Sequence, residues 1–384
     1  MVRLLILLPT NLFAPKIVDM CIAASDELHA LGNSTRRSLW LWGRFRKYET
    51  IRFFAGDEVN PLAIERLKAM CASKAIDMVA PIDLDGAAFL AAARSHIPRI
   101  RCFPFSSPEV LRLLADKWSC GALAKEAHVE APTSFLLRAA KDLEAQWVDD
   151  LAYPVVVKPA RLEGGRGVVR IGTRKQLEAH VLGGRRYSRP PLIVQQFIHG
   201  RDADVDLLAD NGKIVFQVCR ERGADGTFRY FRDPDLERAA AALVARSGYT
   251  GIANLDFVRE VGTGTYIFLE FNPRAWSNIW LSELAGMNFI RLGMELALGA
   301  KTPREFSQPP LKVFNIRGAC RAFLQGRGFE VSEANRLAIG AQLRRPDFIV
   351  SNKIAARFKS VTDALTPVSP SKLFAMRASF NPPG

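Results

Sequence analysis

The sequence predicts a mixed α/β and α+β protein, in which a parallel α/β domain comes first and antiparallel strands follow. Two observations lead to this prediction. Strand-like and helix-like patterns alternate from residue 1 to about 105, and such alternation favours a parallel sheet covered by helices. Further along, two strand-like runs in residues 252–278 flank a glycine-bracketed turn, which is typical of an antiparallel hairpin.

The composition is that of a globular protein with room for two or three domains. The chain has 384 residues, of which 48% are hydrophobic and 24% charged, and its formal net charge is +14. This balance favours anionic partners such as nucleotides, polyanionic substrates, nucleic acid or an acidic membrane surface. The six cysteines have no close-pair spacing, so we expect reduced thiols in a cytoplasmic protein rather than a zinc site or a disulfide frame.

The alternating elements of the first domain can be placed along the chain. We expect strands at residues 4–8, 51–54, 77–82 and 100–103, and helices at 16–31, 61–74 and 86–95. The turn after the first strand lacks a glycine cluster, so a dinucleotide fingerprint is absent and the domain is expected to help bind an acceptor substrate. Asp83 and Asp85 follow a strand, where such sheets place ligands, and helix capping explains them equally well.

A helix is expected from residue 107, and it carries Lys117, which by itself is an ordinary surface lysine. Residues 153–173 indicate a phosphate site, because an apolar strand presents Lys158 and a glycine-rich turn follows it. Backbone N–H groups of glycines can close over phosphate oxygens. A plain flexible turn has the same composition. The turn glycines are Gly164, Gly165 and Gly167.

The next segment indicates a nucleoside site. An apolar strand at residues 192–195 runs into Gln196 and Ile198, whose free backbone groups can pair with an adenine edge. The acids Asp202, Asp204 and Asp206 follow, and a carboxylate there can accept from ribose hydroxyls. An edge strand leading into a loop explains this segment equally well.

The hairpin at residues 252–278 indicates a metal site. If the turn centres on Thr263, Asp256 faces Glu270 and Asn254 faces Asn272 on one face. Two facing carboxylates about 5 Å apart repel unless a cation lies between them. Their oxygens and the Asn272 amide suit Mg²⁺ or Mn²⁺ with a bound nucleotide. A solvated face with two acids is the alternative.

The opposite face of this hairpin is expected to pack against a core. The apolar residues assigned to it are Leu255, Phe257, Ile267, Leu269 and Phe271. Arg274 follows the second strand directly, beside the expected metal position.

The order and spacing of these segments resemble the ATP-grasp superfamily over about residues 107–300. The residues that carry the resemblance are Lys117, Lys158 with its glycine-rich loop, residues 194–198, Gly200 with Asp202, Asp256, and residues 270–274. More narrowly, the chain is similar to the ATP-dependent carboxylate–amine ligases grouped with D-alanine–D-alanine ligase, biotin carboxylase and carbamoyl-phosphate synthetase. The resemblance implies a pre-ATP-grasp parallel α/β domain at 1–106, an ATP-grasp domain at 107–300 with a mobile lid subdomain at about 151–198, and a basic extension at 301–384.

The resemblance also implies a role for each candidate residue. The nucleotide-binding residues it implies are Lys117, Lys158, Gly164, Gly165, Gly167, Gln195, Gln196, Ile198 and Asp202. The metal ligands it implies are Asp256, Glu270 and Asn272. Arg274 and Lys158 are the implied catalytic residues, with Arg274 steadying the substrate carboxylate and the developing acyl phosphate.

The chain departs from the family pattern at three places, one of which is residues 128–132, where a glycine-containing loop is common. Gln195 and Gln196 stand where an acid is more common, which affects adenine affinity rather than mechanism, because amides also pair with adenine. Trp276 stands where a small residue is common. We interpret Trp276 as shaping an acceptor pocket, and a core-filling tryptophan is an equal alternative.

The implied function is an ATP-dependent, ADP-forming ligase that activates a carboxylate as an acyl phosphate and couples it to an amine or thiol. A catalytically silent ATP sensor and a bicarbonate-activating, carboxylase-like enzyme are the alternatives. A nucleic-acid partner is not expected, because only the net charge suggests one. The basic C-terminal region has a helical apolar spacing that suits an acidic membrane surface, and a solvated face explains it equally well. The substrate pair and the oligomeric state do not follow from the sequence.

Overall fold

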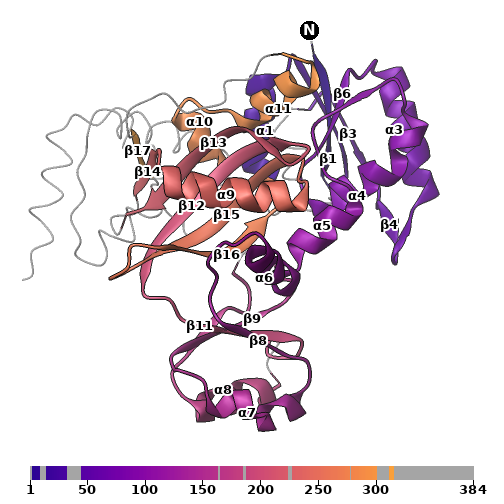
Figure 1. Cartoon of the computed structure of the whole chain (residues 1–384). Helices are drawn as coiled ribbons and strands as arrows, with labels where there is room; N and C mark the ends of the chain where they lie inside the picture. Colours follow the sequence, from indigo (N-terminus) through magenta and orange to yellow (C-terminus); the bar gives the residue numbers. More distant parts are fainter. Residues whose placement is uncertain are drawn as a thin grey trace, which may run out of the picture.

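The structure is a computed structural model that describes residues 2–8, 14–32, 45–162, 165–184, 187–223, 227–276, 278–300 and 311–314. Figure 1 shows three groups of elements: an N-terminal sheet with helices, a large sheet beside it, and a smaller sheet with two helices at the far end. The mixed α/β and α+β class expected from the sequence is confirmed. Gly164 and nearly all of the C-terminal extension lie outside the described residues.

The N-terminal sheet has five parallel strands in the order β3-β2-β1-β6-β7. Its strands are β1 (Arg3–Leu8), β2 (Glu27–Gly32), β3 (Lys47–Thr50), β6 (Met78–Pro81) and β7 (Arg101–Cys102). Its helices are α1 (Ala14–Ala24), α3 (Pro61–Ser73) and α4 (Leu84–Ala93). Asp83 caps α4 by accepting from the Gly86 amide at 2.8 Å, so helix capping explains this acid.

The expected helix at 16–31 is wrong in its second half. The helix ends at Ala24, and residues 27–32 form β2, which pairs with β1. Five of the six β2 residues are buried, so its apolar side chains do not alternate with polar ones. Periodicity alone does not distinguish such a short buried strand from a buried helix. The expected strand at 51–54 is also displaced, because β3 ends at Thr50 and the short strand β4 (Phe54–Ala55) follows, paired with β5 (Glu58–Val59).

The expected helix from residue 107 is two helices, α5 (Pro108–Ala115) and α6 (Lys117–Glu126). The break occurs at Asp116, whose carboxylate accepts from the amides of Trp118 at 3.1 Å and Ser119 at 3.0 Å. An Asp at this position satisfies the free N–H groups of a new helix, so it starts α6. Lys117 is therefore the first residue of a helix.

The smaller sheet has the order β10-β9-β11-β8 and lies at the bottom of Figure 1. Its strands are β8 (Ser134–Leu137), β9 (Val155–Pro159), β10 (Val169–Ile171) and β11 (Leu192–Gln196), and it is covered by α7 (Gln146–Asp149) and α8 (Arg174–Leu182). It has a hydrophobic core of its own. Because β11 lies between β9 and β8, its interpretation as an edge strand is wrong. The sheet includes β8, which precedes the expected lid boundary at 151; the domain boundaries themselves stay predictions.

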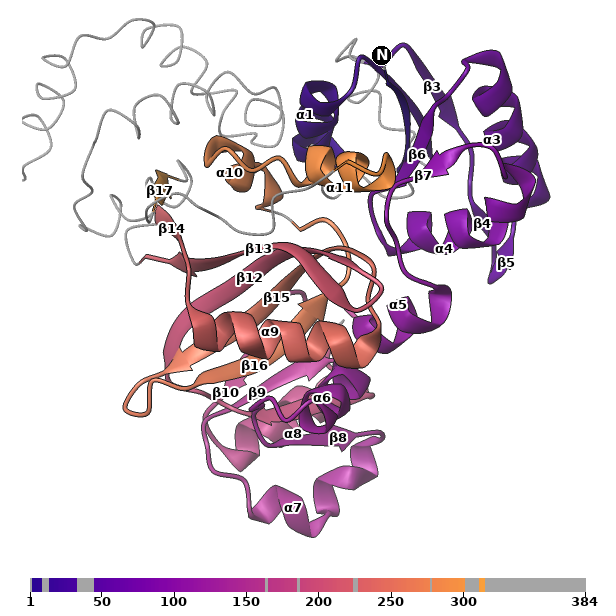
Figure 2. The ribbon, with the colours of Figure 1, turned by 45° about the horizontal axis from the view of Figure 1, so that its top comes forward.

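The large sheet has the order β16-β15-β12-β13-β14-β17, with every pair antiparallel. Its strands are β12 (Gly200–Asp210), β13 (Lys213–Arg222), β14 (Thr227–Phe231), β15 (Gly251–Glu260), β16 (Tyr266–Asn272) and β17 (Leu311–Phe314). The helix α9 (Pro234–Ser247) covers one face. The opposite face is covered in part by α10 (Ile279–Leu284) and α11 (Phe289–Ala297) (Figure 2).

The register of the β15–β16 hairpin confirms the expected pairs. Asp256 is opposite Glu270, and Asn254 is opposite Asn272. A β-bulge between Asp256 and Phe257 then shifts the pairing, so that Leu269 is the extra residue on β16. Because of this shift, two of the expected core assignments are wrong. Ile267 and the half-buried Leu269 do not belong to that core face, and Phe268 packs there with Phe257 instead.

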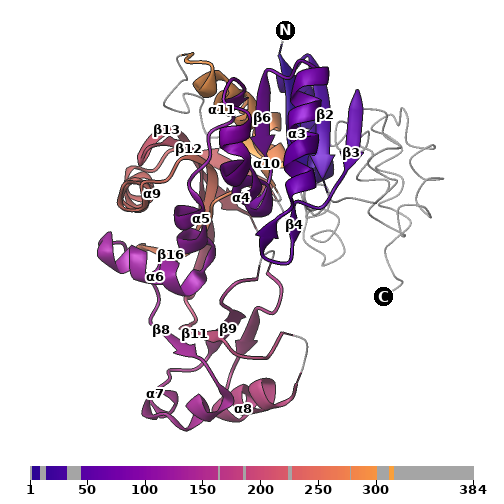
Figure 3. The same cartoon turned by 90° about the vertical axis from the view of Figure 1, so that its right-hand side faces the viewer.

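The N-terminal domain and the large sheet share one hydrophobic core. Residues of β1, β2 and β6 pack in it together with residues of β12, β13, α10 and α11. Figure 3 shows these elements close together and the smaller sheet separate below them. Trp276 is 4% exposed in this core and packs edge-on against Phe289, so it fills the core and the pocket-shaping interpretation is wrong. Within the described ranges, no helix has the length and apolarity needed to cross a membrane.

A tight contact between the two parts of this core gives a first prediction. A Cβ added to Gly293 of α11 would lie 2.2 Å from ring atoms of Phe103. The substitution Gly293→Ala should therefore lower the free energy of unfolding by about 1–3 kcal/mol through overpacking. Denaturant unfolding measures this change. Gly121→Ala on α6 is the matched control: its Cβ would meet nothing within 4 Å, so stability should stay equal or rise by about 0.5–1 kcal/mol.

Candidate functional site

Four charged side chains form a row across one face of the large sheet. Arg220 of β13 is opposite Asp204 of β12, and Asp204 is opposite Asp256 of β15. Asp256 is in turn opposite Glu270 of β16. Neighbouring strands lie about 4.8 Å apart, so three carboxylates stand side by side with a guanidinium at one end.

A second row of polar side chains runs parallel to the first. Asn254 Nδ2 donates to Asp206 Oδ1 at 3.0 Å. Asn272 Nδ2 lies 3.5 Å from Asn254 Oδ1 and 3.3 Å from Asp256 Oδ2, and donates to both. Arg274 Nη2 donates to Asn272 Oδ1 at 3.3 Å. The two rows are therefore joined at Asp256.

Two lysines reach these rows from other elements. Lys117, at the start of α6, forms an ion pair with Glu270, with 3.0 Å between Nζ and Oε1. Lys158, from β9 of the smaller sheet, is 6% exposed and donates to the carbonyl of Leu269 at 3.4 Å. That carbonyl belongs to the bulge residue, so the bulge supplies the acceptor for Lys158. The structure thus brings together both predicted phosphate-binding lysines and the predicted metal acids.

The close packing of these charges shifts their pKa values. Burial raises the pKa of Asp256 well above its usual range, and the carboxylates of Asp204 and Glu270 raise it further. Burial lowers the pKa of Lys158, while Glu270 acts in the opposite direction. Burial also raises the pKa of Asp206 to about 7, opposed by Arg220. Each shift reflects a charge that lacks water around it and is therefore stabilised by an added ion of opposite sign.

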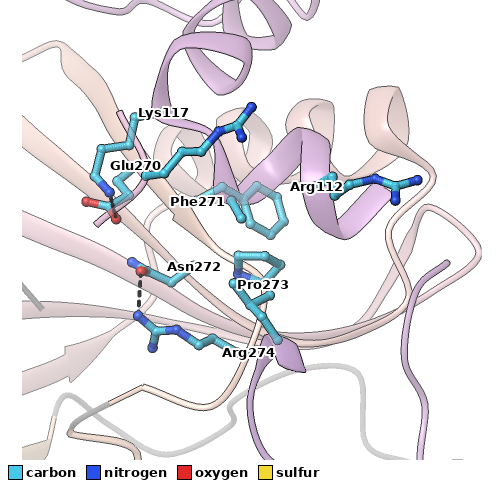
Figure 4. Close-up of a pocket in the computed structure, with 10 residues that line it drawn as sticks. Arg112, Lys117, Glu270, Phe271, Asn272, Pro273 and Arg274 are labelled. Carbon is cyan, nitrogen blue, oxygen red and sulfur yellow. Dashed lines mark hydrogen bonds and ion pairs between the residues drawn. The ribbon is translucent and has the colours of Figure 1, made fainter. Parts of the chain in front are cut away.

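The pocket beside these rows carries mostly positive charge. Its volume is about 170 Å³, and it lies where α4, α5 and α6 approach the end of β16. The residues that line it are Leu84, Arg112, Ala115, Lys117, Arg161, Glu270, Phe271, Asn272, Pro273 and Arg274. In Figure 4, Lys117 and Glu270 point toward each other and the guanidinium of Arg274 contacts Asn272. The pocket therefore offers an anionic ligand a place next to Glu270.

The donor set fits a hard divalent cation. Asp256, Glu270 and Asn272 offer only oxygen ligands that share one face, and a cation between the two acids would remove their repulsion. Within the described residues, no group of three or more His, Cys, Asp or Glu side chains is arranged to hold a metal ion. Two acids and an amide suit Mg²⁺, which takes much of its shell from water and phosphate oxygens.

The residues predicted to bind the nucleoside lie at the end of β11, in the segment that follows it, and near the start of β12. The Gln195 side chain is 8% exposed and donates to Ser134 Oγ at 3.0 Å, whereas Gln196 is exposed. Ile198 is half-buried just before β12 begins. Asp202 is exposed on β12, opposite Val258 and on the same face as the charged rows. Their roles toward adenine and ribose stay predictions.

The two described glycines of the turn after β9 both have positive φ, 70° for Gly165 and 76° for Gly167. A Cβ at Gly167 would lie 2.7 Å from the Tyr187 Cβ and 2.9 Å from the Pro159 Cγ, so only glycine fits there. At Gly165 a Cβ would meet nothing within 4 Å.

Sequence reasoning assigned no site role to Arg220 and considered Asp204 and Asp206 only as acids that could contact ribose. Arg220 is 3% exposed, with its Nη2 2.5 Å from Asp204 Oδ2 and its Nε 3.3 Å from Asp206 Oδ2. The alternation of Asp202, Asp204 and Asp206 indicates that these acids share one face of a strand. No pattern in the sequence indicates that this face meets that of Asp256, because β12 and β15 are far apart along the chain.

Solved structures share this fold. An L-amino acid ligase from Bacillus licheniformis superposes with a TM-score of 0.60 at 18% identity, covering 78% of this chain and 74% of that chain. The biotin carboxylase domain of 2-oxoglutarate carboxylase from Hydrogenobacter thermophilus, in complex with MgADP, ADP and bicarbonate, superposes with a TM-score of 0.58 at 16% identity, covering 79% of this chain and 71% of that chain. Identities this low show a common fold, which is that of ATP-grasp proteins with a lid.

Family models agree with the fold. Residues 188–319 match the model described as ATP-grasp in the biosynthetic pathway with Ter operon, and residues 116–230 match the ATP binding domain of the carbamoyl-phosphate synthase L chain. The arginine-specific large chain of carbamoyl phosphate synthase from Bacillus subtilis is 24% identical over 175 residues, which is 42% of this chain and 17% of that relative. These matches support the resemblance to the ATP-grasp superfamily that the motifs indicated.

The buried ion pairs of Arg220 give a second prediction. Arg220→Met would leave Asp204 and Asp206 without their cation, and removing one partner of a buried pair costs about 3–5 kcal/mol. We expect the free energy of unfolding to fall by that amount in urea titrations. Arg201→Met, an exposed arginine of β12, should change it by no more than about 0.5 kcal/mol. Equal stability of the two variants would contradict a stabilising role for Arg220.

Proposed function

We propose that the protein is an ATP-dependent ligase that activates a small-molecule carboxylate as an acyl phosphate, releases ADP and couples the acyl group to an amine or thiol. One observation supports this proposal above the others. Asp256 and Glu270 are opposite each other in the β15–β16 register, with Lys117, Lys158 and Arg274 around them. This is the arrangement that binding of a magnesium–nucleotide complex next to a second anion requires.

The reaction brings three groups of negative charge together: the triphosphate, the attacking carboxylate and the acids that hold the cation. Asp256, Glu270 and Asn272 would hold Mg²⁺ or Mn²⁺, which would neutralise the negative charge that develops on the phosphate oxygens. Lys117 already lies 3.0 Å from Glu270 and can donate to a phosphate oxygen beside it. Lys158, buried and with a lowered pKa, gains an anionic partner in the same way.

In this proposal Arg274 receives the substrate carboxylate. It is 7% exposed, lines the pocket beside Glu270 and bonds to Asn272 Oδ1 and the Ala275 carbonyl. A guanidinium binds a carboxylate in a fixed plane, so it can orient the attacking oxygen toward the γ-phosphoryl group. The resulting acyl phosphate is easily hydrolysed, and closure of the smaller sheet over the site as a lid would exclude water.

The nucleoside would lie between the smaller and the large sheet. In this proposal Gln195, Gln196 and the Ile198 backbone face adenine, Asp202 accepts from ribose, and Gly165 and Gly167 belong to the phosphate loop. The outward position of Asp202 on β12 is compatible with a ribose contact. We expect the protein to work in the cytoplasm with ATP and Mg²⁺.

Bicarbonate activation is a second candidate. The structural neighbour from Hydrogenobacter thermophilus binds bicarbonate together with MgADP, and a pocket of about 170 Å³ lined by arginines accommodates so small an anion. An ATP sensor without catalysis is the third reading, and it lacks support because both metal acids and Arg274 are retained. Product analysis separates the candidates: coupled amide or thioester for the ligase, carboxylated acceptor for the second, and no product for the sensor.

The two carboxylates proposed as metal ligands, those of Asp256 and Glu270, give a third prediction. Glu270→Gln keeps the shape of the side chain and removes a negative charge from the row, so ADP release in the presence of Mg²⁺ should fall by at least about a hundredfold. A screen of amino acids, sugar acids and short peptides, read as ADP formed, measures this change. Glu260→Gln at the far end of β15 is the control and should keep full activity. Equal ADP release by wild type and Glu270→Gln would contradict a role for Glu270 in turnover.

The acyl phosphate route gives a fourth prediction. Attack of a carboxylate on the γ-phosphoryl group releases ADP and then phosphate, so these products should form in equal amounts with the coupled product. Nucleotides separated by ion-exchange chromatography show which bond is broken. Formation of AMP and pyrophosphate would rule out this mechanism.

A further inference from the structure

Four side chains form a continuous row across the smaller sheet. Arg170 of β10 is opposite Val156 of β9, and Val156 is opposite Gln195 of β11. Gln195 is in turn opposite Ser134 of β8 and donates to its Oγ at 3.0 Å. Residues that are opposite each other in a sheet share one face, so the row crosses all four strands on the same side.

This row lies on the face of the smaller sheet that meets the large sheet. Lys158, two residues beyond Val156 on the same strand, shares this face and reaches the Leu269 carbonyl of β16. The residues that alternate with the row pack instead in the separate core with α7 and α8; they are Leu137, Val155, Val157, Ile171, Leu192 and Val194. The row therefore faces the side on which the nucleotide is proposed to lie.

The guanidinium of Arg170 rests on an aromatic ring. Its Cζ is 4.2 Å from the ring centroid of Phe197, which follows β11. A planar cation at this distance over a ring is held there by cation–π attraction and stacking. Arg170 is exposed, so the second face of its guanidinium is available to another planar group.

The row also sets a direction for the nucleotide. Lys158 and the glycine-rich turn, which are proposed to hold the phosphates, follow Val156 along the chain. Gln195, which is proposed to face adenine, lies next to Val156 across the sheet. A base over Val156 would lie between Gln195 and Arg170, which are two strand spacings apart, or about 10 Å. Arg170 is thus on the side of the base rather than that of the phosphates.

We propose that Arg170 is a further nucleotide-binding residue, whose guanidinium, held on the Phe197 ring, stacks on the base of the bound nucleotide. This inference rests on the proposed function, because it concerns the same nucleotide. Guanidinium planes stack on nucleobases, and stacking tolerates any base because every base has a π face. Arg170 would therefore add affinity, whereas hydrogen bonds from Gln195 and its neighbours would distinguish adenine.

Removal of the guanidinium tests this role. Arg170→Met keeps an extended side chain, and Arg170→Lys keeps the charge without the plane. We expect both variants to bind ADP about tenfold more weakly than wild type in isothermal titration calorimetry, as for the loss of one stacking side chain. Binding of inorganic pyrophosphate should stay unchanged, because it has no base. Lys175→Met, which removes an exposed positive charge from α8 beyond the other face of the sheet, is the control and should bind ADP as wild type does.

The outcomes separate stacking on the base from a charge contact with phosphate. An Arg170→Lys variant that binds ADP as tightly as wild type would overturn the inference, because charge alone would then suffice. Equal weakening of ADP and pyrophosphate binding in Arg170→Met would also overturn it, since the contact would then be with phosphate. Unchanged ADP binding by Arg170→Met would leave no role for the guanidinium and has the same consequence.

A second substitution tests the support of the guanidinium. Phe197→Leu stays apolar and removes the ring, so ADP binding should weaken about threefold while pyrophosphate binding is unchanged. Wild-type affinity for ADP in this variant would overturn the role of the ring in holding Arg170. Wild-type protein that binds neither ADP nor ATP would overturn the proposed nucleotide site and this inference with it, whereas wild type that binds ADP without any effect of Arg170→Met overturns this inference alone.

Discussion

The repulsion among three carboxylates on adjacent strands constrains much of the surrounding structure. Asp204, Asp256 and Glu270 occupy neighbouring positions on β12, β15 and β16. Such a row is stable only with cations close by. The chain supplies them from three separate segments, namely Arg220 within the same sheet, Lys117 from α6 and Lys158 from the smaller sheet. The negative charge on one face of the large sheet is therefore paired with cations from elements that lie far apart in the sequence.

Two local irregularities place these cations. Asp116 ends α5 and caps α6, so that Lys117 stands at a helix start facing Glu270. The bulge after Asp256 leaves Leu269 unpaired with β15 and turns its carbonyl toward Lys158. Bulges recur beside active sites for this reason, since they redirect a backbone group without changing the rest of the sheet.

The sequence predicts much of this site because its main signals are local. The facing pairs of the β15–β16 hairpin follow from the position of one turn, and the register confirms them. The bulge does not follow, because the run from Tyr266 to Asn272 has no glycine or proline to mark it. Hydrophobic periodicity does not predict the strand β2, because this strand is buried on both faces and its side chains do not alternate in polarity.

Non-local pairing limits prediction more strongly. Asp204 and Asp206 are visible in the sequence as alternating acids, and Arg220 as one of many arginines. These three residues lie near Asp256 because β12 lies between β13 and β15 in the sheet. In the sequence, residues 223–250 separate β13 from β15. Only the three-dimensional arrangement shows that they form one face.

The separate core of the smaller sheet has a consequence for local unfolding. Its buried residues contact one another, whereas the core around α10 and α11 joins the N-terminal strands to the large sheet. Amide protons in β8, β9, β10 and β11 can therefore exchange with solvent through a partial opening that leaves the rest of the protein folded. Among the described residues, Lys158 belongs to this separate core unit, whereas the acids that it faces belong to the large sheet.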